Sequence, residues 1–260
     1  MNQAARPRVV RSLASHVFLK FLPKDPTNMS LLTDLQNYAK RTHAEAWATR
    51  NGQKVPATED IKLGNEAVKV DATVLYADLA ESTQLVKGKK DWFAAEVYKN
   101  YLYTAGRIIR AQGGVITSFD GDRIMAVFLG NTKNTDAAKC GLRIKWAVDE
   151  ILQPAITARY PKSTYQLKQK VGIDTSSLFV ARTGIRGSND LVWVGNAANN
   201  AAKMAALPTT YSTYISAASY NMLLDSSKYG GPKKKNMWTD LGKDQLGYTI
   251  YGSTWRSSIS

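Results

Sequence analysis

The chain has 260 residues, enough for one large domain, and its 44% hydrophobic content is that of an ordinary globular core. Its one cysteine, Cys140, excludes an intrachain disulfide and a cysteine-rich metal site, and it fits a reducing compartment. The net charge of +14 favours attraction to polyanions but selects no function, because scattered lysines also keep a surface soluble.

The chain contains no apolar run of about 18 residues, so the sequence predicts no membrane span. The opening segment, residues 1–23, resembles an export signal only weakly. His16 and Lys20 interrupt its apolar part, and no small-residue cleavage site follows. We therefore expect a cytoplasmic protein.

The N-terminal quarter of the chain differs in pattern from the rest. Residues 28–50 carry apolar side chains at helical spacing, which predicts a helix. The segment 51–67 is rich in turn-forming and charged residues and predicts a linker. We therefore expect a helical N-terminal extension over 1–66 and a main domain over 67–255.

The main domain alternates between strand and helix patterns. The predicted elements are a strand at 68–78, a helix at 91–112, a hairpin at 115–128, a helix at 135–156, two strands within 165–184 around a Ser176-Ser177 turn, a strand at 191–195, a helix at 196–207, a strand and helix within 213–224, and a strand at 245–253. The order β-α-β-β-α-β is that of a ferredoxin-like core, followed here by C-terminal additions. The sequence therefore predicts the α+β class.

Two aspartates stand where the first strand and the hairpin end. Asp78 closes the first strand, and Asp122 follows Asp120-Gly121, a dipeptide typical of tight turns. In the ferredoxin-like topology these elements are neighbours, so the two carboxylates converge and repel unless a proton or a cation lies between them. Mg²⁺ suits such a pair and also takes phosphate oxygens, whereas no CxxC or His cluster favours zinc.

Two other groups are candidates for binding a phosphorylated ligand. After Asp78, a predicted loop offers backbone amides together with the hydroxyls of Ser82 and Thr83, although ordinary Ser/Thr turn chemistry explains the same residues. Asn199 and Lys203 are four residues apart on the alanine-rich helix and so share one face. An amide and a cation suit a ribose and a phosphoryl group, and a solvated polar face is the alternative.

Taken together, these segments resemble the catalytic domain of the class III nucleotidyl cyclases, from about residue 70 to residue 251. Four segments carry the resemblance, in this order: LYADLAEST, GGVITSFDGDRIMAVF, VGIDTSSLFVARTG and VWVGNAANNAAKMAAL. The resemblance implies that Asp78, Asp122 and the Leu79 carbonyl hold two metal ions, Mn²⁺ or Mg²⁺.

The same resemblance implies roles for residues near the C-terminal end of the domain. Asn199 would orient the ribose, and Lys203 would meet the α-phosphate where the family usually has an arginine. Lys243 would contact the terminal phosphates. In this family one chain supplies the carboxylates and its partner supplies the asparagine and the cation, so a homodimer with two composite sites is implied.

The positions that select the base depart from the purine-specific pattern of the family. Ser118 stands where adenylyl cyclases have a lysine, and Val192 stands where they have an acidic or polar residue. Tyr76 precedes Asp78 by two residues on the same strand face, where its ring fills space that a purine needs. Arg123 offers donors to a pyrimidine carbonyl. A plain core aromatic is the alternative interpretation of Tyr76.

This combination resembles the pyrimidine cyclases of bacterial anti-phage (Pycsar) systems. The resemblance implies UTP or CTP as the substrate, cyclic UMP or cyclic CMP as the product, and a separate effector protein that responds to the product. We expect UTP, because Arg123 as a pure donor matches the carbonyls of uracil better than the amine of cytosine.

Three alternatives remain open at the level of sequence. One is a purine cyclase with unusual base contacts, and another is a cyclase-like regulator that binds nucleotide without turnover. The third is an RNA-binding module of similar topology, which the charge allows. That module needs exposed aromatics on the central strands, and the sequence has polar or aliphatic residues there, so we expect no nucleic-acid partner.

Overall fold

The computed structural model describes residues 30–243 and 246–259. The segment 1–23, considered above as an export signal, lies outside the described residues. The contacts between Cα atoms divide the chain into two units, which meet between Ala46 and Trp47. Within the described residues, no helix is long and apolar enough to cross a membrane.

The first unit contributes the helix α1 (Leu31–Ala44), which is shorter than the predicted helix. Ser30 caps its start, because the Ser30 Oγ accepts a hydrogen bond of 3.3 Å from the backbone N–H of Thr33. The backbone becomes extended at Glu45, and β1 (Ala48–Asn51) follows as a strand. Since β1 pairs in parallel with β2, the second unit begins earlier in the chain than the predicted residue 67.

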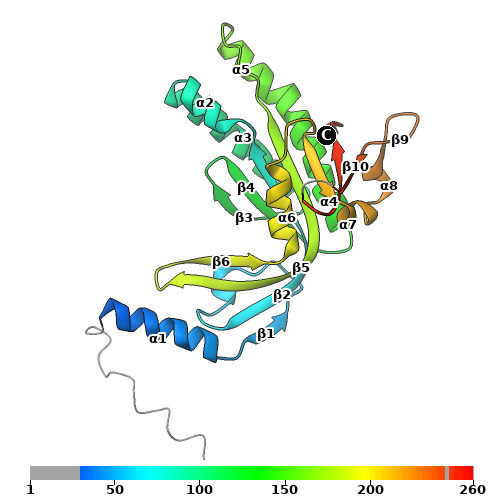
Figure 1. The fold of residues 1–260 in the computed structure, drawn as a ribbon. Coiled ribbons are helices and arrows are strands. Elements are labelled where there is room, and N and C mark those ends of the chain that lie inside the picture. Colours follow the sequence, from blue (N-terminus) through cyan, green and yellow to red (C-terminus); the bar gives the residue numbers. More distant parts are fainter. Residues whose placement is uncertain (1–29, 244–245, 260) are drawn as a thin grey trace, which may run out of the picture. The chain divides into compact units, whose positions relative to one another are not determined.

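A large sheet forms the centre of the second unit (Figure 1). Its other strands are β2 (Glu66–Leu79), β3 (Val115–Asp120), β4 (Arg123–Phe128), β5 (Gln169–Ile185), β6 (Ser188–Val194), β7 (Thr213–Ser216), β10 (Thr239–Lys243) and β11 (Thr249–Ser253). The order is β10-β11-β7-β5-β2-β4-β3, with β1 beside β2 and β6 beside β5. The run β5-β2-β4-β3 is the ferredoxin-like core, which confirms the predicted fold class.

The helices lie on both faces of this sheet. They are α2 (Ser82–Gly88), α3 (Asp91–Ala111), α4 (Lys133–Ala147), α5 (Gln153–Arg159), α6 (Asn196–Ala205), α7 (Ala217–Asn221) and α8 (Asp225–Lys228), with short turns at Thr58–Asp60 and Val148–Leu152 and a small pair of strands, β8 (Tyr229–Gly230) and β9 (Lys235–Asn236). Leu75 and Leu79 of β2 pack into the core under α3 and α4, whereas Val74 and Tyr76 pack on the opposite face with α6. By this alternation Asp78 projects on the same face as Tyr76.

The segment predicted as two strands is one continuous strand of 17 residues, β5. The prediction of a turn at Ser176-Ser177 is wrong, since these residues pair with Ala72 and Asp71 of β2 without a break in register. The local turn preference of serine is overridden by the long antiparallel ladder between β2 and β5. The chain turns instead at residues 186–187, between β5 and β6.

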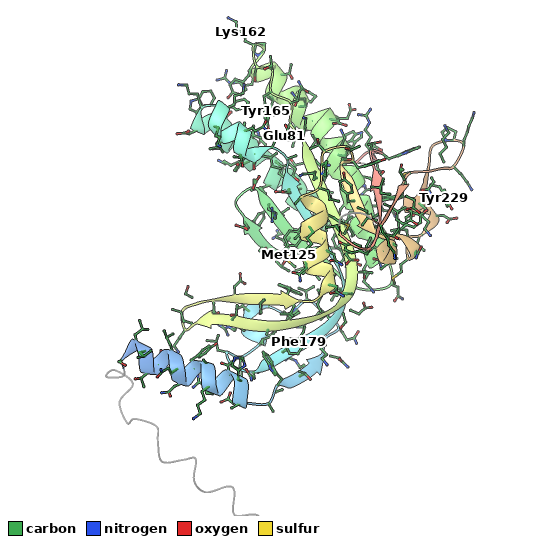
Figure 2. The ribbon with its side chains drawn as sticks, in the orientation of Figure 1. Glu81, Met125, Lys162, Tyr165, Phe179 and Tyr229 are labelled. Atoms are coloured by element: carbon green, nitrogen blue, oxygen red, sulfur yellow. The ribbon has the colours of Figure 1, made fainter. Side chains whose placement is uncertain are left out.

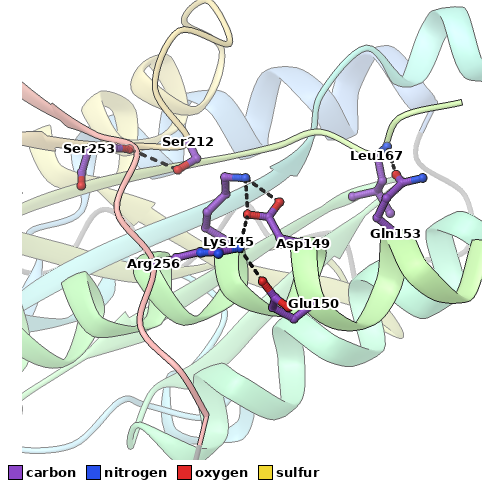
Figure 3. Close-up of polar contacts among 8 residues, drawn as sticks. All are labelled: Lys145, Asp149, Glu150, Gln153, Leu167, Ser212, Ser253 and Arg256. Atoms are coloured by element: carbon purple, nitrogen blue, oxygen red, sulfur yellow. Dashed lines mark hydrogen bonds and ion pairs between the residues drawn. The ribbon is translucent and has the colours of Figure 1, made fainter.

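The predicted helix over 135–156 is longer and is interrupted. A single π-helical turn, Val148–Leu152, separates α4 from α5. Pro154 lies in the first turn of α5, directly after the π-helical turn, and the helix continues to Arg159. Arg256 fastens the C-terminal segment to this run, because its guanidinium lies 2.5 Å from Glu150 and 3.6 Å from Asp149 (Figure 3).

Candidate active site

The tip of the β3–β4 hairpin positions Asp122. Asp120 pairs with Arg123, so the two turn residues are Gly121 and Asp122 rather than the predicted Asp120 and Gly121. Gly121 has a φ of +59°, which glycine adopts without strain, at the first position of the turn. Asp122 therefore lies in the turn at the end of the hairpin. It directly precedes Arg123, the first residue of β4, and β4 is paired with β2.

Asp78 lies in the centre of the sheet, between Arg123 of β4 and Lys170 of β5. It is only 9% exposed, and the Arg123 Nη2 lies 3.5 Å from its Oδ2. Burial raises the pKa of Asp78, Arg123 opposes this rise, and the charge of Asp122 adds to it. The two carboxylates are thus close enough to influence one another, and in the single chain the positive group beside Asp78 is Arg123.

The carboxylate pair also has unused binding capacity. The Asp122 Oδ2 is buried, and no hydrogen bond reaches it within the described residues. A buried carboxylate oxygen without a partner is unfavourable, and a divalent cation would satisfy it. The described residues hold no cluster of three or more His, Cys, Asp or Glu suited to a metal, so an ion here needs oxygen ligands from backbone, water or phosphate. The residues therefore fit Mg²⁺ or Mn²⁺.

Close packing against β5 positions α6, which carries Asn199 and Lys203. A Cβ atom on Gly172 would lie 2.1 Å from the Ala201 carbonyl oxygen, so any larger residue would push α6 off the sheet. The Ser176 Oγ accepts a hydrogen bond of 3.0 Å from the N–H of Ala197 at the start of the helix. Asn199 and Lys203 both lie on the exposed side of α6, as their spacing predicts.

A buried aspartate that the sequence analysis missed also holds α6. Asp174 of β5 is 3% exposed and accepts hydrogen bonds from Asn200 Nδ2 at 2.8 Å, from the Thr175 N–H at 2.8 Å and from the Ser216 hydroxyl. Asn200 is the neighbour of Asn199, so this network sets the rotation of the helix. An aspartate inside an apolar strand was the available signal, because such a group requires partners.

We expect Asp174→Ala to lower the free energy of unfolding by about 3 kcal/mol, because buried donors lose a charged acceptor. Urea denaturation measures this loss. Asp174→Asn keeps one acceptor oxygen and is expected to lose less, and Asp91→Ala on the exposed surface is the control. Equal unfolding free energies for Asp174→Ala and the unmodified chain would contradict the role assigned to this network.

A hollow of about 410 Å³ opens beside Asn199. Tyr76, Ser118 and Val192 line it together with Asn199, whereas Arg123, the fourth candidate for binding the base, does not line it and lies beside Asp78. Val192 is 40% exposed and presents an apolar side chain to this space. Neither Asp78 nor Asp122 lines the hollow, although Tyr76 and Ser118, which do, belong to the same strand and hairpin as these two aspartates.

The phosphate candidates are less closely gathered. Ser82 is the first residue of α2, so the predicted loop is short, and Glu81 before it has the left-handed φ of +62°. Thr83 is exposed in the same turn. Lys243 ends β10, which β11, β7 and β5 separate from β2, so it does not lie beside the carboxylates of its own chain.

Lys170 is a candidate that the sequence analysis missed. It is half-buried directly across the sheet from Asp78, and its Nζ donates to the Leu207 carbonyl at 2.8 Å. Burial lowers the pKa of Lys170, and the negative charge of Asp78 opposes this effect. Lys170 faces Asp78 because of the register between β2 and β5, and this register cannot be read from local sequence patterns.

Known proteins similar to this chain are nucleotide cyclases. A uridylate cyclase from Xanthomonas perforans is 50% identical over 233 residues, 89% of this chain and 100% of that protein. The adenylyl cyclase CyaB from P. aeruginosa has a TM-score of 0.61 at 22% identity, over 75% of this chain and 100% of that chain. A non-canonical dimeric guanylyl cyclase domain from Blastocladiella emersonii has a TM-score of 0.55 at 14% identity, over 72% of this chain and 97% of that chain. No protein-family model matches the chain.

Proposed function

The chain belongs to the uridylate cyclases within the class III nucleotidyl cyclases, and we propose that it converts UTP to 3′,5′-cyclic UMP and pyrophosphate. The observation that carries the choice of base is the hollow shared by Tyr76, Ser118, Val192 and Asn199. It brings a ribose-binding amide next to side chains that lack the usual purine-recognising groups. The name of the Xanthomonas relative supports the same substrate.

The hollow favours a pyrimidine for reasons of size and polarity. The ring of Tyr76 occupies part of the space, and Val192 offers no hydrogen bond to the edge of a base. Ser118 and Val192 stand at the two positions where the family's purine-binding members carry their base-recognising groups, so a purine bound there would lose those two hydrogen bonds and with them part of the selectivity for its base. Uracil is smaller, and we infer that its carbonyls accept hydrogen bonds from an Arg123 side chain that moves from Asp78 toward the base, since Arg123 does not line the hollow in the single chain.

The carboxylate pair supplies the other half of the site. We infer that Asp78, Asp122 and the Leu79 carbonyl hold two divalent ions, Mn²⁺ or Mg²⁺. When bound, these ions supply positive charge that lowers the pKa of the ribose 3′-hydroxyl and neutralises the triphosphate. Ser82 and Thr83 at the start of α2 donate to the phosphate oxygens, and Lys170 and Lys243 add positive charge.

The side chains of α6 act on the reacting centre. Asn199 orients the ribose so that its 3′-oxygen faces the α-phosphorus. As the bond between this oxygen and phosphorus forms, the bond to the pyrophosphate oxygen breaks and the hydroxyl proton is released. Lys203 stabilises the charge that develops on the α-phosphoryl oxygens, as a point charge rather than a bidentate fork.

The two halves come together in a homodimer with two composite sites. Asn199 and Lys203 are exposed on α6, and neither Asp78 nor Asp122 of the same chain lines the hollow beside Asn199. A second copy supplies the missing half in each case. The composite site that the resemblance to the class III cyclases implies supports this arrangement.

The biological setting follows from the chemistry of the product. A cyclic pyrimidine nucleotide acts only through a protein that binds it, so we propose a separate effector. The resemblance to the Pycsar cyclases supports a role in anti-phage defence. The single thiol, Cys140, is buried with a raised pKa, which supports a cytoplasmic setting where it stays reduced.

Incubation of the purified protein with Mn²⁺ and each of the four nucleoside triphosphates tests the choice of substrate. We expect cyclic UMP as the main product, about 100-fold or more above either purine product, because the ring of Tyr76 takes space that a purine needs and Ser118 and Val192 replace the usual purine-recognising groups. Chromatography with mass detection identifies the products. Dominant cyclic AMP or cyclic GMP would contradict the proposal, and dominant cyclic CMP would correct the base.

Tyr76→Ala tests whether ring size sets the specificity. We expect turnover of ATP relative to UTP to rise about tenfold, because the hollow gains the volume of a phenol ring. The control is Tyr211→Ala, which removes a phenol that does not line the hollow. An unchanged ATP-to-UTP ratio in Tyr76→Ala would show that Tyr76 is only a core aromatic.

A further inference from the structure

A second pocket, of about 400 Å³, lies between the α2–α3 link and the loop that follows α5. The three aromatic residues that line it, Trp92, Phe93 and Tyr160, form one cluster. The ring centroids of Trp92 and Tyr160 are 5.7 Å apart with planes at 40°, and those of Phe93 and Tyr160 are 5.0 Å apart. Phe93 is 5% exposed, whereas Trp92 is 55% exposed, so the indole presents a free face to solvent.

The rim of this pocket is cationic. Lys89 and Lys90 line it from the α2–α3 link, and Arg159 and Lys162 line it from the end of α5, where Figure 2 labels Lys162. No lining residue is acidic. Within the described residues none of these four side chains forms an ion pair, although the Arg159 guanidinium lies 5.3 Å from the ring centre of Tyr160. The rim therefore carries positive charge that an anionic ligand would neutralise.

The loop that forms one wall is fixed by specific hydrogen bonds. The Tyr160 hydroxyl donates to Glu96 of α3 at 2.5 Å. Gln153 accepts a hydrogen bond of 2.7 Å from the Leu167 N–H (Figure 3). Its side-chain amide also donates to the Tyr165 carbonyl at 3.1 Å. The aromatic wall is thus held in place before any ligand arrives, which lowers the cost of binding.

The pocket is distinct from the active site. Ser82 starts α2 on the side of the carboxylates, and Lys89 follows the other end of that helix. None of the residues assigned to the metals, the base or the phosphates lines the second pocket. Its volume is in the range of small-molecule sites, about 300–1,000 Å³.

We propose that this pocket binds a mononucleotide, with the base stacked on Trp92 and the phosphate held by the lysines and Arg159. An exposed indole face suits any nucleobase, and ammonium and guanidinium groups suit a phosphate. A planar ring with a negative charge attached matches an aromatic wall below a cationic rim. The ligand is either the triphosphate substrate or the cyclic product, which share this chemistry.

Calorimetric titration of the whole protein with UMP, UTP and cyclic UMP tests this site, in EDTA so that no metal bridges the catalytic carboxylates. We expect binding that Trp92→Ala weakens about tenfold or more, while Trp92→Phe keeps most of the affinity because it keeps a ring. Lys90→Glu/Lys162→Glu should weaken it at least as much. Calorimetry also reports nucleotide bound at the proposed ribose site, so Asn199→Ala measures that contribution, and the binding that remains in this variant should be the part that Trp92→Ala weakens.

The matched control for charge is Lys233→Glu/Lys235→Glu. This double variant makes the same change in net charge on an exposed segment that does not line the pocket. It should bind nucleotide as tightly as the unmodified protein at 0.15 M salt, because charges are screened there over about 8 Å. Uridine, which lacks the phosphate, and pyrophosphate, which lacks the base, should each bind about tenfold more weakly than UMP. The tighter binder of UTP and cyclic UMP shows whether the pocket takes the substrate or the product.

Three results would overturn the proposal. They are binding of nucleotide that is insensitive to Trp92→Ala, binding of pyrophosphate as tight as that of UMP, and tighter binding of an acidic, aromatic-containing peptide than of any nucleotide. The last result would reassign the pocket to a protein partner. Cyclase activity of Trp92→Ala on UTP is measured in parallel. This measurement reveals a folding defect, and it tests the proposed cyclase reaction separately from binding at the second pocket.

Discussion

Asp78→Asn and Asp122→Asn are each expected to lower cyclase activity about 10³-fold or more, because each removes a charged oxygen ligand from the proposed metal site. The structure explains why the effect is large at both positions. The Asp122 Oδ2 has no hydrogen-bond partner within the described residues, and Asp78 is buried beside it. An amide keeps the shape of each side chain and removes its charge.

Asp120→Asn is the matched control for this prediction. Asp120 belongs to the same hairpin, is exposed and lies two residues from Asp122. Its substitution therefore tests whether losing any negative charge in this hairpin lowers the activity, or only losing the charge of Asp122. We expect it to keep most of the activity. Initial rates with UTP and saturating Mn²⁺ give the comparison, and activity within tenfold of the unmodified protein in Asp122→Asn would count against a metal role.

Mixing two inactive variants should restore activity if each site is shared between chains. Asp78→Asn disables the carboxylate half, and Asn199→Ala disables the ribose half. In a random mixture half of the dimers are heterodimers, and each of these has one intact site, so about a quarter of full activity is expected. From a background of about 10⁻³, this is a gain of more than a hundredfold.

The control for this experiment is a mixture of Asp78→Asn with Asp122→Asn. Both substitutions lie in the same half-site, so no heterodimer contains an intact site and no activity returns. Dissociation and reassociation, or co-expression with two affinity tags, prepares the mixed dimers. Mixed dimers of Asp78→Asn and Asn199→Ala that stay inactive would show that each chain builds its site alone.

Local sequence patterns predicted the parts of the fold that depend on local chemistry. The β3–β4 hairpin and the helix α6 lie where their patterns placed them. The patterns failed at β5, where serines typical of a turn continue a strand, and at Ala48–Asn51, where β1 forms by pairing with β2. In both places pairing with a distant strand outweighs local preference.

The candidate site shows the same difference between what local patterns predict and what depends on contacts with distant elements. Motif spacing singled out Asp78, Asp122, Asn199 and Lys203 as candidates, because the first two end or precede predictable strands and the last two share one face of a predictable helix. It missed Lys170 and Asp174, whose significance depends on which residue of another element faces them. It also assigned Arg123 only to the base, whereas in the single chain Arg123 lies beside Asp78.

The most direct measurement of the central claim is a crystal structure of the protein soaked with Mn²⁺ and a non-hydrolysable UTP analogue, with anomalous scattering used to locate manganese. We predict manganese peaks between the side chains of residues 78 and 122, with the triphosphate bound to them and the ribose beside the asparagine of a second chain. Anomalous maps with no manganese at these side chains, and a nucleotide bound elsewhere, would contradict this account.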